Sequence, residues 1–122
     1  MEDRELTVKQ LTRLVRKYIL KWKSKLFLGM WRVDFNIRNY LSSDIDSSFH
    51  EVARCSTKWN YFTALLEFSH VMMASMKDEE IERVIIHELM HVVVNELREH
   101  GIEHEERVVS HLTMIHTFME GI

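Results

Sequence analysis

Two histidines and a glutamate stand together in an otherwise apolar stretch of the sequence. His87 and His91 are four residues apart in RVIIHELMHVVV (83–94), and Glu88 directly follows the first histidine. On a helix, residues four apart face the same way at about 6 Å, so both imidazoles could hold one ion. Burying imidazoles and a carboxylate without partners costs several kcal/mol. A divalent metal ion is therefore the expected partner of this group.

The neighbours of these residues argue against the alternative, a solvated face of an amphipathic helix. They are apolar around nearly the whole predicted helix, and such a helix is buried. These neighbours are Ile81, Val84, Ile85, Ile86, Leu89, Met90, Val92, Val93, Val94 and Leu97. The pattern H-E-x-x-H on a helix is a zinc-binding signature, with two histidine ligands and a carboxylate that acts on a zinc-bound water. We therefore expect zinc (Zn2+) as the cofactor, His87 and His91 as ligands, and Glu88 as the catalytic base.

A zinc site with an open position needs a third protein ligand. One known extension of the motif has a glycine and then a histidine, three and six residues after the second histidine. Here these positions hold Val94 and Leu97, so a third histidine ligand at this spacing is excluded. An aspartate is excluded downstream, because the last one in the chain is Asp78. The remaining candidates are the glutamates and histidines of IEHEERVVSHL (102–112).

Helical spacing separates these candidates. Glu105 lies three residues before Val108 and seven before Leu112, which belong to a predicted core stripe, so Glu105 is expected to point inward as the third ligand. Glu106 is rotated by about 100° from it, toward solvent. Glu106 and His104 remain the alternatives.

The hydrophobic pattern changes its period along the chain. Apolar residues at helical spacing predict an amphipathic helix over about 5–24. Strict alternation then predicts a strand over 31–39 with one buried and one solvated face. Two more strands are expected at 49–55 and 59–68, joined as a hairpin by the short polar link STK (56–58).

Two helices are predicted to follow the strands. The first starts with Asp78 as N-cap and runs to about His100, with Gly101 just past its end. The second covers about 103–120. Its predicted core stripe is Val108, Leu112, Ile115 and Met119. The order helix, three strands, helix, helix predicts one α+β domain over 1–122, with a mainly antiparallel sheet and helices on one side.

Composition and charge limit the environment and the partners. With 46% hydrophobic and 29% charged residues, the 122-residue chain is expected to fold as one soluble domain. Its apolar runs are far shorter than the ~20 residues of a membrane span, and its charged start is no secretory signal. The single Cys55 fits a reducing cytoplasm. Residues 1–32 hold nine Lys and Arg against three acids, but these spread around a helix that needs a solvated face, so nucleic acid is not the expected partner.

With H-E-x-x-H followed by a glutamate 14 positions after the second histidine, the chain resembles gluzincin-type zincin metallopeptidases. The resemblance is closest to the single-domain minigluzincins and to small phage and prokaryotic metallopeptidases. The matching segments are WRVDF, ARC, YFTALLEF, VIIHELMHVVV and HEERVVSHL, and they span roughly residues 30–120. The resemblance implies a minimal zincin-like domain in which His87, His91 and Glu105 bind zinc and Glu88 is the general base.

The resemblance also implies a peptide or protein substrate that lies along an edge strand at about Trp59–Phe68. Gluzincins often use a tyrosine or a histidine to stabilise the oxyanion, and the candidates here are Tyr61, His104, His111 and His116. We therefore expect a zinc-dependent metalloendopeptidase. The alternative is a non-catalytic structural or regulatory module in which zinc only joins the last two helices. The sequence does not fix the natural substrate or the oligomeric state.

Overall fold

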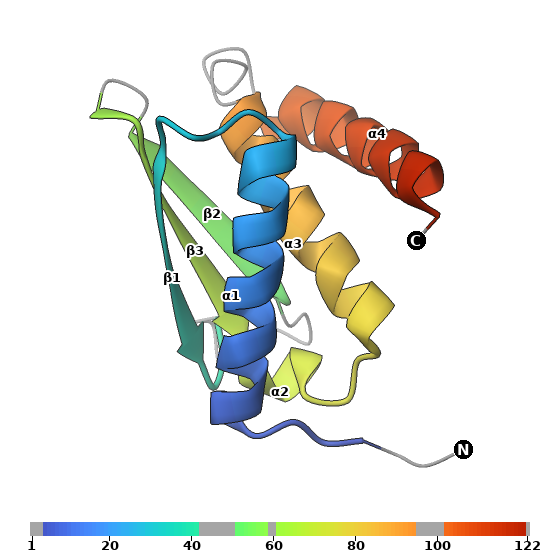
Figure 1. Cartoon of the computed structure of the whole chain (residues 1–122). Coiled ribbons are helices and arrows are strands. Elements are labelled where there is room, and N and C mark those ends of the chain that lie inside the picture. Colours follow the sequence, from blue (N-terminus) through green and yellow to red (C-terminus); the bar gives the residue numbers. More distant parts are fainter. Residues whose placement is uncertain (1–3, 42–50, 59–60, 95–101, 122) are drawn as a thin grey trace.

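The predicted helices and strands form an α+β fold, as expected. The computed structural model describes residues 4–41, 51–58, 61–94 and 102–121, except for the side chains of 102–105. The elements, labelled in Figure 1, are α1 (Val8–Lys25), β1 (Arg32–Arg38), β2 (Ala53–Lys58), β3 (Thr63–Ser69), α2 (His70–Met73), α3 (Asp78–Val93) and α4 (Ile102–Glu120). The four-residue helix α2 is the one element that the sequence pattern does not predict.

Helix α1 begins where its side chains can satisfy the free backbone groups. The Thr7 hydroxyl accepts from the Gln10 N–H at 3.1 Å, and the Gln10 side chain accepts from the Thr7 N–H at 2.9 Å, a reciprocal capping box. The buried stripe of this helix is Leu11, Val15, Tyr18, Ile19 and Trp22. These residues recur at helical spacing, as the predicted amphipathic helix requires, and they form the α1 side of the core.

The sheet has the strand order β1-β3-β2. Strand β3 pairs with β1 in parallel and with β2 in antiparallel fashion, so the sheet is mixed rather than mainly antiparallel. Successive strands do reverse direction, but β3 inserts between the two earlier strands and therefore runs parallel to β1. The predicted hairpin is present as β2–β3. Its connection lies after Lys58, because residues 56–58 pair with β3 instead of forming the turn.

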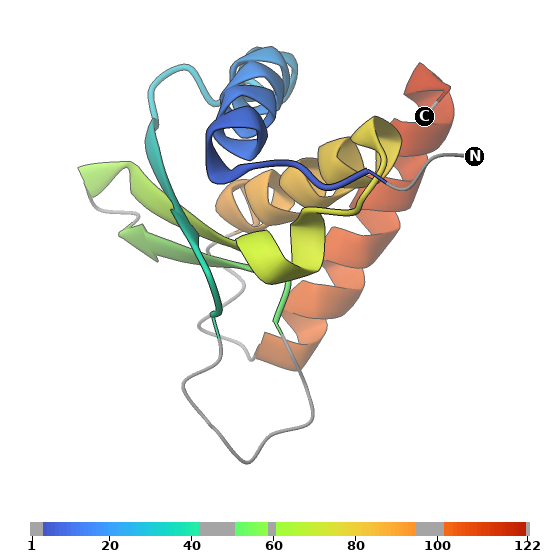
Figure 2. The ribbon, with the colours of Figure 1, turned by 90° about the horizontal axis from the view of Figure 1, so that it is seen from below.

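Helices α1 and α3 lie on the same face of the sheet (Figures 1 and 2). Beneath them, β3 contributes its fully buried residues Leu66 and Phe68 to the core, as its alternation predicts. Phe62, placed on the same face by that alternation, precedes the strand and is 45% exposed. The opposite face of β1 is polar and exposed, which confirms the pattern read from 31–39. Helix α4 packs against α3 on the side away from β1 (Figure 2).

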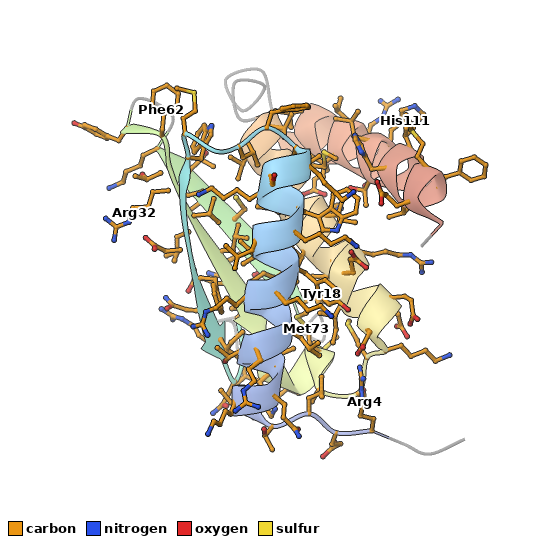
Figure 3. All side chains as sticks on the ribbon, in the orientation of Figure 1. Arg4, Tyr18, Arg32, Phe62, Met73 and His111 are labelled. Atoms are coloured by element: carbon orange, nitrogen blue, oxygen red, sulfur yellow. The ribbon has the colours of Figure 1, made fainter. Side chains whose placement is uncertain are left out.

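The N-cap of α3 lies one residue earlier than the predicted Asp78. Lys77 is the N-cap, and its backbone N–H donates to the Glu80 carboxylate at 3.4 Å. Asp78 is the first helical residue, and its carboxylate pairs with Arg4 at 2.6 Å (Figure 3). The acids of this first turn still face the positive end of the helix dipole. The predicted end of the helix, His100 and Gly101, lies outside the described residues.

Helix α3 is joined to α1 by a buried carboxylate. Glu82 is 7% exposed, and it accepts hydrogen bonds from Trp22 Nε1 and from Lys21 Nζ, both at 2.6 Å. Because both donors come from α1, this contact fixes α3 across the sheet. Within the part of the chain that the structure describes, no helix is long and apolar enough to cross a membrane.

Candidate metal centre

The C-terminal half of α3 brings His87, Glu88 and His91 together. One ligand atom from each residue lies within 4.8 Å of the others. The two imidazole rings meet edge to face, with their centroids 5.1 Å apart. Glu88 and His91 are each 6% exposed, and the His87 side chain is 28% exposed. The spacing predicted from the helix period is therefore realised in a group that is nearly closed to solvent.

The surroundings of this group keep the His87 imidazole suited to metal binding. Ile86 and Met90 flank it on α3 and are almost fully buried. Burial lowers the pKa of His87, and the neighbouring His91 lowers it further, whereas the Glu106 carboxylate acts in the opposite direction. A lowered pKa keeps the ring neutral, and a neutral ring offers the lone pair that a metal ion requires.

Helix α4 adds a second carboxylate to the group. Glu106 places one oxygen 2.9 Å from His91 Nε2 and the other 3.3 Å from His87 Nε2. In a tetrahedral zinc site with bonds of 2.0–2.1 Å, neighbouring ligand atoms are about 3.3 Å apart. The distances from the Glu106 oxygens to the two imidazole nitrogens are thus close to those that a small ion held by the three groups would impose.

Glu106 is half exposed, as its predicted orientation toward solvent implies, but the rotation of α4 also brings its carboxylate onto the two histidines. Among the described side chains of this helix, the buried ones are Val109 and Thr117, whereas Val108 is 37% exposed. The predicted core stripe of Val108, Leu112, Ile115 and Met119 is therefore wrong as the inward face. The buried face lies about one residue further along, and Glu106, three residues before Val109, lies at the solvent-exposed N-terminal end of this face.

The predicted third ligand, Glu105, cannot be compared with Glu106 directly. Its backbone belongs to α4, but its side chain lies outside the described part of the structure, as does that of His104. The stripe that pointed Glu105 inward is not the buried one, so that reason for choosing it is gone. The signal that identifies Glu106 is its spacing of three, seven and eleven residues before Val109, Thr113 and Thr117. Two threonines make a weak core pattern, which is why the more apolar stripe was preferred.

The residues considered for the oxyanion lie in different places. Tyr61 is 71% exposed in the connection between β2 and β3. His116 packs edge-on against Trp22, with ring centroids 6.2 Å apart. His111 is exposed on the side of α4 turned away from the sheet (Figure 3).

The strand expected to bind substrate also changes. The segment Trp59–Phe68 was expected at the edge of the sheet, but β3 is central, because the hairpin places β2 on one of its sides and β1 takes the other. The edge strand on the α3 side is β2, which packs against α3. Next to Glu106, the surface of α4 carries an open hollow of about 790 Å³, whose lining includes Val108, Leu112 and Met114.

Comparison with known proteins gives a family for this arrangement. The family model described as "putative phage metallopeptidase" matches residues 4–118, almost the whole chain and every element described above. The comparisons with curated proteins and with solved structures find no match. A metal-dependent peptidase family agrees with two histidines and two glutamates gathered on α3 and α4. The chain belongs to the putative phage metallopeptidase family.

Proposed function

We propose that this chain is a zinc-dependent endopeptidase in which His87 and His91 bind the metal and Glu88 is the general base. One observation carries the proposal: the Glu106 carboxylate contacts both imidazoles, at 2.9 and 3.3 Å, and ligand atoms of His87, His91 and the buried Glu88 lie within 4.8 Å of one another. Two nitrogens and one carboxylate oxygen are a donor set that suits zinc and leaves a fourth position open.

The third ligand of the proposed site is a glutamate from the first turn of α4. The sequence favours Glu105, whereas the contacts to both histidines favour Glu106. We propose Glu106, because a carboxylate already in contact with both imidazoles needs little movement to share an ion with them. Glu105 remains the competing ligand, and a pair of matched variants separates the two, as described below.

Zinc, when bound, would act as a Lewis acid toward the scissile carbonyl and would lower the pKa of a coordinated water to about 7. Glu88 is held beside the ligands by the rigid turn of α3, so its carboxylate can take a proton from the attacking water. It can then give that proton to the leaving amine, which returns Glu88 to its charged form. The apolar residues around α3 exclude bulk water and so strengthen each of these charge interactions.

A peptide substrate fits the free edge of β2. Among the described residues, β3 is the only strand that pairs with β2, so the other edge of β2 offers backbone donors and acceptors that can pair with an extended peptide. Because β2 also packs against α3, a peptide on this edge would pass close to the proposed metal. Main-chain pairing of this kind favours unfolded or extended segments as substrates.

The experiment that tests the proposal measures zinc content and peptide cleavage on the same preparations. We expect about one zinc per chain, and cleavage of an unstructured peptide that chelation abolishes and zinc restores. Glu88→Gln should keep the zinc and lose activity by at least about 1,000-fold. Glu82→Gln is the matched control, because it changes a second buried glutamate of the same helix, and it should retain most of the activity of the folded protein.

The alternative is a non-catalytic module in which the metal only holds α4 against α3. One observation favours it, since the proposed ligands come from both helices and an ion would join them. The peptidase and the non-catalytic module differ in the number of protein ligands at the metal and in whether Glu88 is needed for cleavage. A closed site with four protein ligands, or equal cleavage by wild type and Glu88→Gln, would rule out the peptidase mechanism.

A further inference from the structure

The part of α4 that does not face α3 is unusually apolar for a solvated helix. Phe118 is 86% exposed, Met119 76%, Met114 69%, Ile115 41% and Val108 37%. Residues 108–119 contain no Asp, Glu, Lys or Arg, although 29% of the whole chain is charged. A solvated helix normally carries its charged residues opposite its core face. Helix α4 is therefore built for contact on more than the side that packs against α3.

The apolar residues on one flank of α4 follow a spacing that is symmetric. Val108, Leu112, Ile115 and Met119, here called the α4 seam, are separated by four, three and four residues. Alternating steps of four and three residues are the spacing of a coiled-coil seam. The series 4-3-4 reads the same in both directions, so the seam is complementary to an antiparallel copy of itself.

We propose that the α4 seam is a dimerisation surface, and that its occupant is α4 of a second copy of this chain in antiparallel orientation. The two-fold axis would pass between Leu112 and Ile115. Val108 would then face Met119 of the second copy at each end, and Leu112 would face Ile115 in the two central layers. Such an interface is isologous, with the same patch on both subunits.

The charge of the helix favours a second copy over other occupants. Two identical faces that carry no formal charge meet without repulsion, and antiparallel helices also place opposite dipole ends together. A helix that lies in a membrane surface normally has lysines and arginines on its polar face, and residues 108–119 have none. An acidic or basic protein partner would likewise find no complementary charge there.

The exposed area sets the expected strength. The exposed seam residues Val108, Ile115 and Met119, together with the flanking Phe118, expose on the order of 500 Å². Two copies that cover each other would therefore bury at most about 1,000 Å² in total, the size of a weak or transient interface. A weak, reversible dimer with a Kd of about 100 µM is expected. The hollow beside Glu106 is lined in part by Val108 and Leu112, so the second copy would also form a wall next to the proposed metal site. The dimer itself does not depend on the proposed peptidase activity.

Sedimentation velocity over a range of about 1 to 200 µM tests the dimer. The mass should rise from 14.7 kDa toward twice that value as concentration increases. Ile115→Lys should abolish the rise, because it places two like charges in the central layers. Ser110→Lys adds the same charge at an exposed position outside the seam and should leave the dimer intact. A monomer at every concentration, or a dimer that tolerates Ile115→Lys, would overturn the proposal.

Disulfide trapping tests the antiparallel register. A mixture of Val108→Cys and Met119→Cys should form a cross-linked heterodimer under mild oxidation. Val108→Cys alone should not, because the two copies of residue 108 would lie about 16 Å apart along the helices. Wild type, which retains Cys55, measures background oxidation. Cross-linking of Val108→Cys to itself would contradict the register, and a monomer whose α4 seam instead binds an apolar substrate peptide would assign this face to the substrate.

Discussion

Two buried glutamates at opposite ends of α3 have similar exposure and different surroundings. Glu82 is 7% exposed and Glu88 is 6% exposed. Around Glu82, α1 supplies two donors, Trp22 Nε1 and Lys21 Nζ. Around Glu88, α3 supplies His87 and His91, and α4 brings another carboxylate, Glu106, onto the two imidazoles. The burial of a carboxylate is therefore not informative by itself, and the element that covers it decides its role.

The difference is one of donor and acceptor balance. At Glu82 one carboxylate meets two N–H donors, one of them cationic, so the chain satisfies the charge by itself. At the other end of α3, two imidazoles and the Glu106 carboxylate lie in contact, and burial lowers the pKa of His87. We propose that a cation bound there satisfies these groups. The N-terminal end of α3 is thus a structural contact, and its C-terminal end is the proposed metal site.

Removal of the metal is expected to change the stability of the protein more than any of the substitutions below. A ligand at about 1,000 times its Kd stabilises the folded state by about 4 kcal/mol, which for a domain of this size corresponds to a Tm change of more than about 10 °C. Chelation should therefore lower the Tm of wild type by that amount, as measured by calorimetry with and without added zinc. Glu82→Gln should show the same zinc-dependent shift. A Tm that zinc and chelator leave unchanged would mean that the C-terminal end of α3 is satisfied without an ion.

Replacing each of the two candidate glutamates of α4 by alanine tests which of them binds the metal. Glu106→Ala should weaken zinc binding at least about 100-fold, or about 2.7 kcal/mol, because it removes a proposed ligand. Glu105→Ala is the matched control and should change the affinity by less than about threefold. Competition with a fluorescent zinc chelator measures both. The reverse ranking would restore Glu105 as the ligand and would show that the contact of Glu106 exists only in the metal-free protein.

Local patterns predicted most of the elements, because each depends on residues close in sequence. The alternation of 31–39 and the helical spacing around His87 and His91 both reappear in the structure. The parallel pairing of β1 with β3 could not be read in this way, because strand order depends on where a later strand inserts. A strand such as β3, buried on one face and flanked on both edges, has the same sequence pattern as an edge strand.

The sequence predicts the site residues that lie on one helix, but not the residue that a second helix contributes. His87, Glu88 and His91 follow from the geometry of a single element, whereas the α4 ligand depends on how a second helix rotates against the first. The most apolar stripe of α4 was expected to be its core face, but Val109 and Thr117 are buried instead. If the seam meets a second copy, the apolar stripe reports a contact that the single chain does not contain. Periodicity detects a buried face, but it does not tell which molecule buries it.

The other end of α3 should respond only in stability. Glu82→Ala leaves the buried Trp22 Nε1 and the partly exposed Lys21 without their acceptor. We expect a loss of about 2 kcal/mol in the free energy of unfolding, with Lys21 recovering part of its interaction from water. Urea denaturation measures the loss. Glu120→Ala breaks the exposed pair with Lys25, 3.1 Å apart, and should cost less than about 0.5 kcal/mol. Equal losses in the two variants would contradict the structural role of Glu82.

The smallest expected effect is a pH dependence confined to the metal-free protein. Burial and the neighbouring His91 lower the pKa of His87, so the unfolded chain takes up a proton at a higher pH than the folded one. In the interval below the ordinary histidine pKa of about 6.5, the unfolded state therefore binds more protons, and the stability of the folded state decreases as pH falls. The decrease should stop once the pH passes below the lowered pKa of the folded state, where both states carry the proton.

Urea titrations of chelated protein at several pH values measure this dependence, and His87→Gln isolates it. Glutamine cannot titrate, so the difference in unfolding free energy between wild type and His87→Gln should shift against wild type as pH falls from about 7 to 5. Six of the other seven histidines contribute to both proteins and cancel to first order, whereas His91, which itself lowers the pKa of His87, is part of the effect that the variant removes. A difference that is independent of pH would show that His87 exchanges protons equally in both states. The C-terminal end of α3 would then be as well solvated as an ordinary surface, and the contrast with Glu82 would disappear.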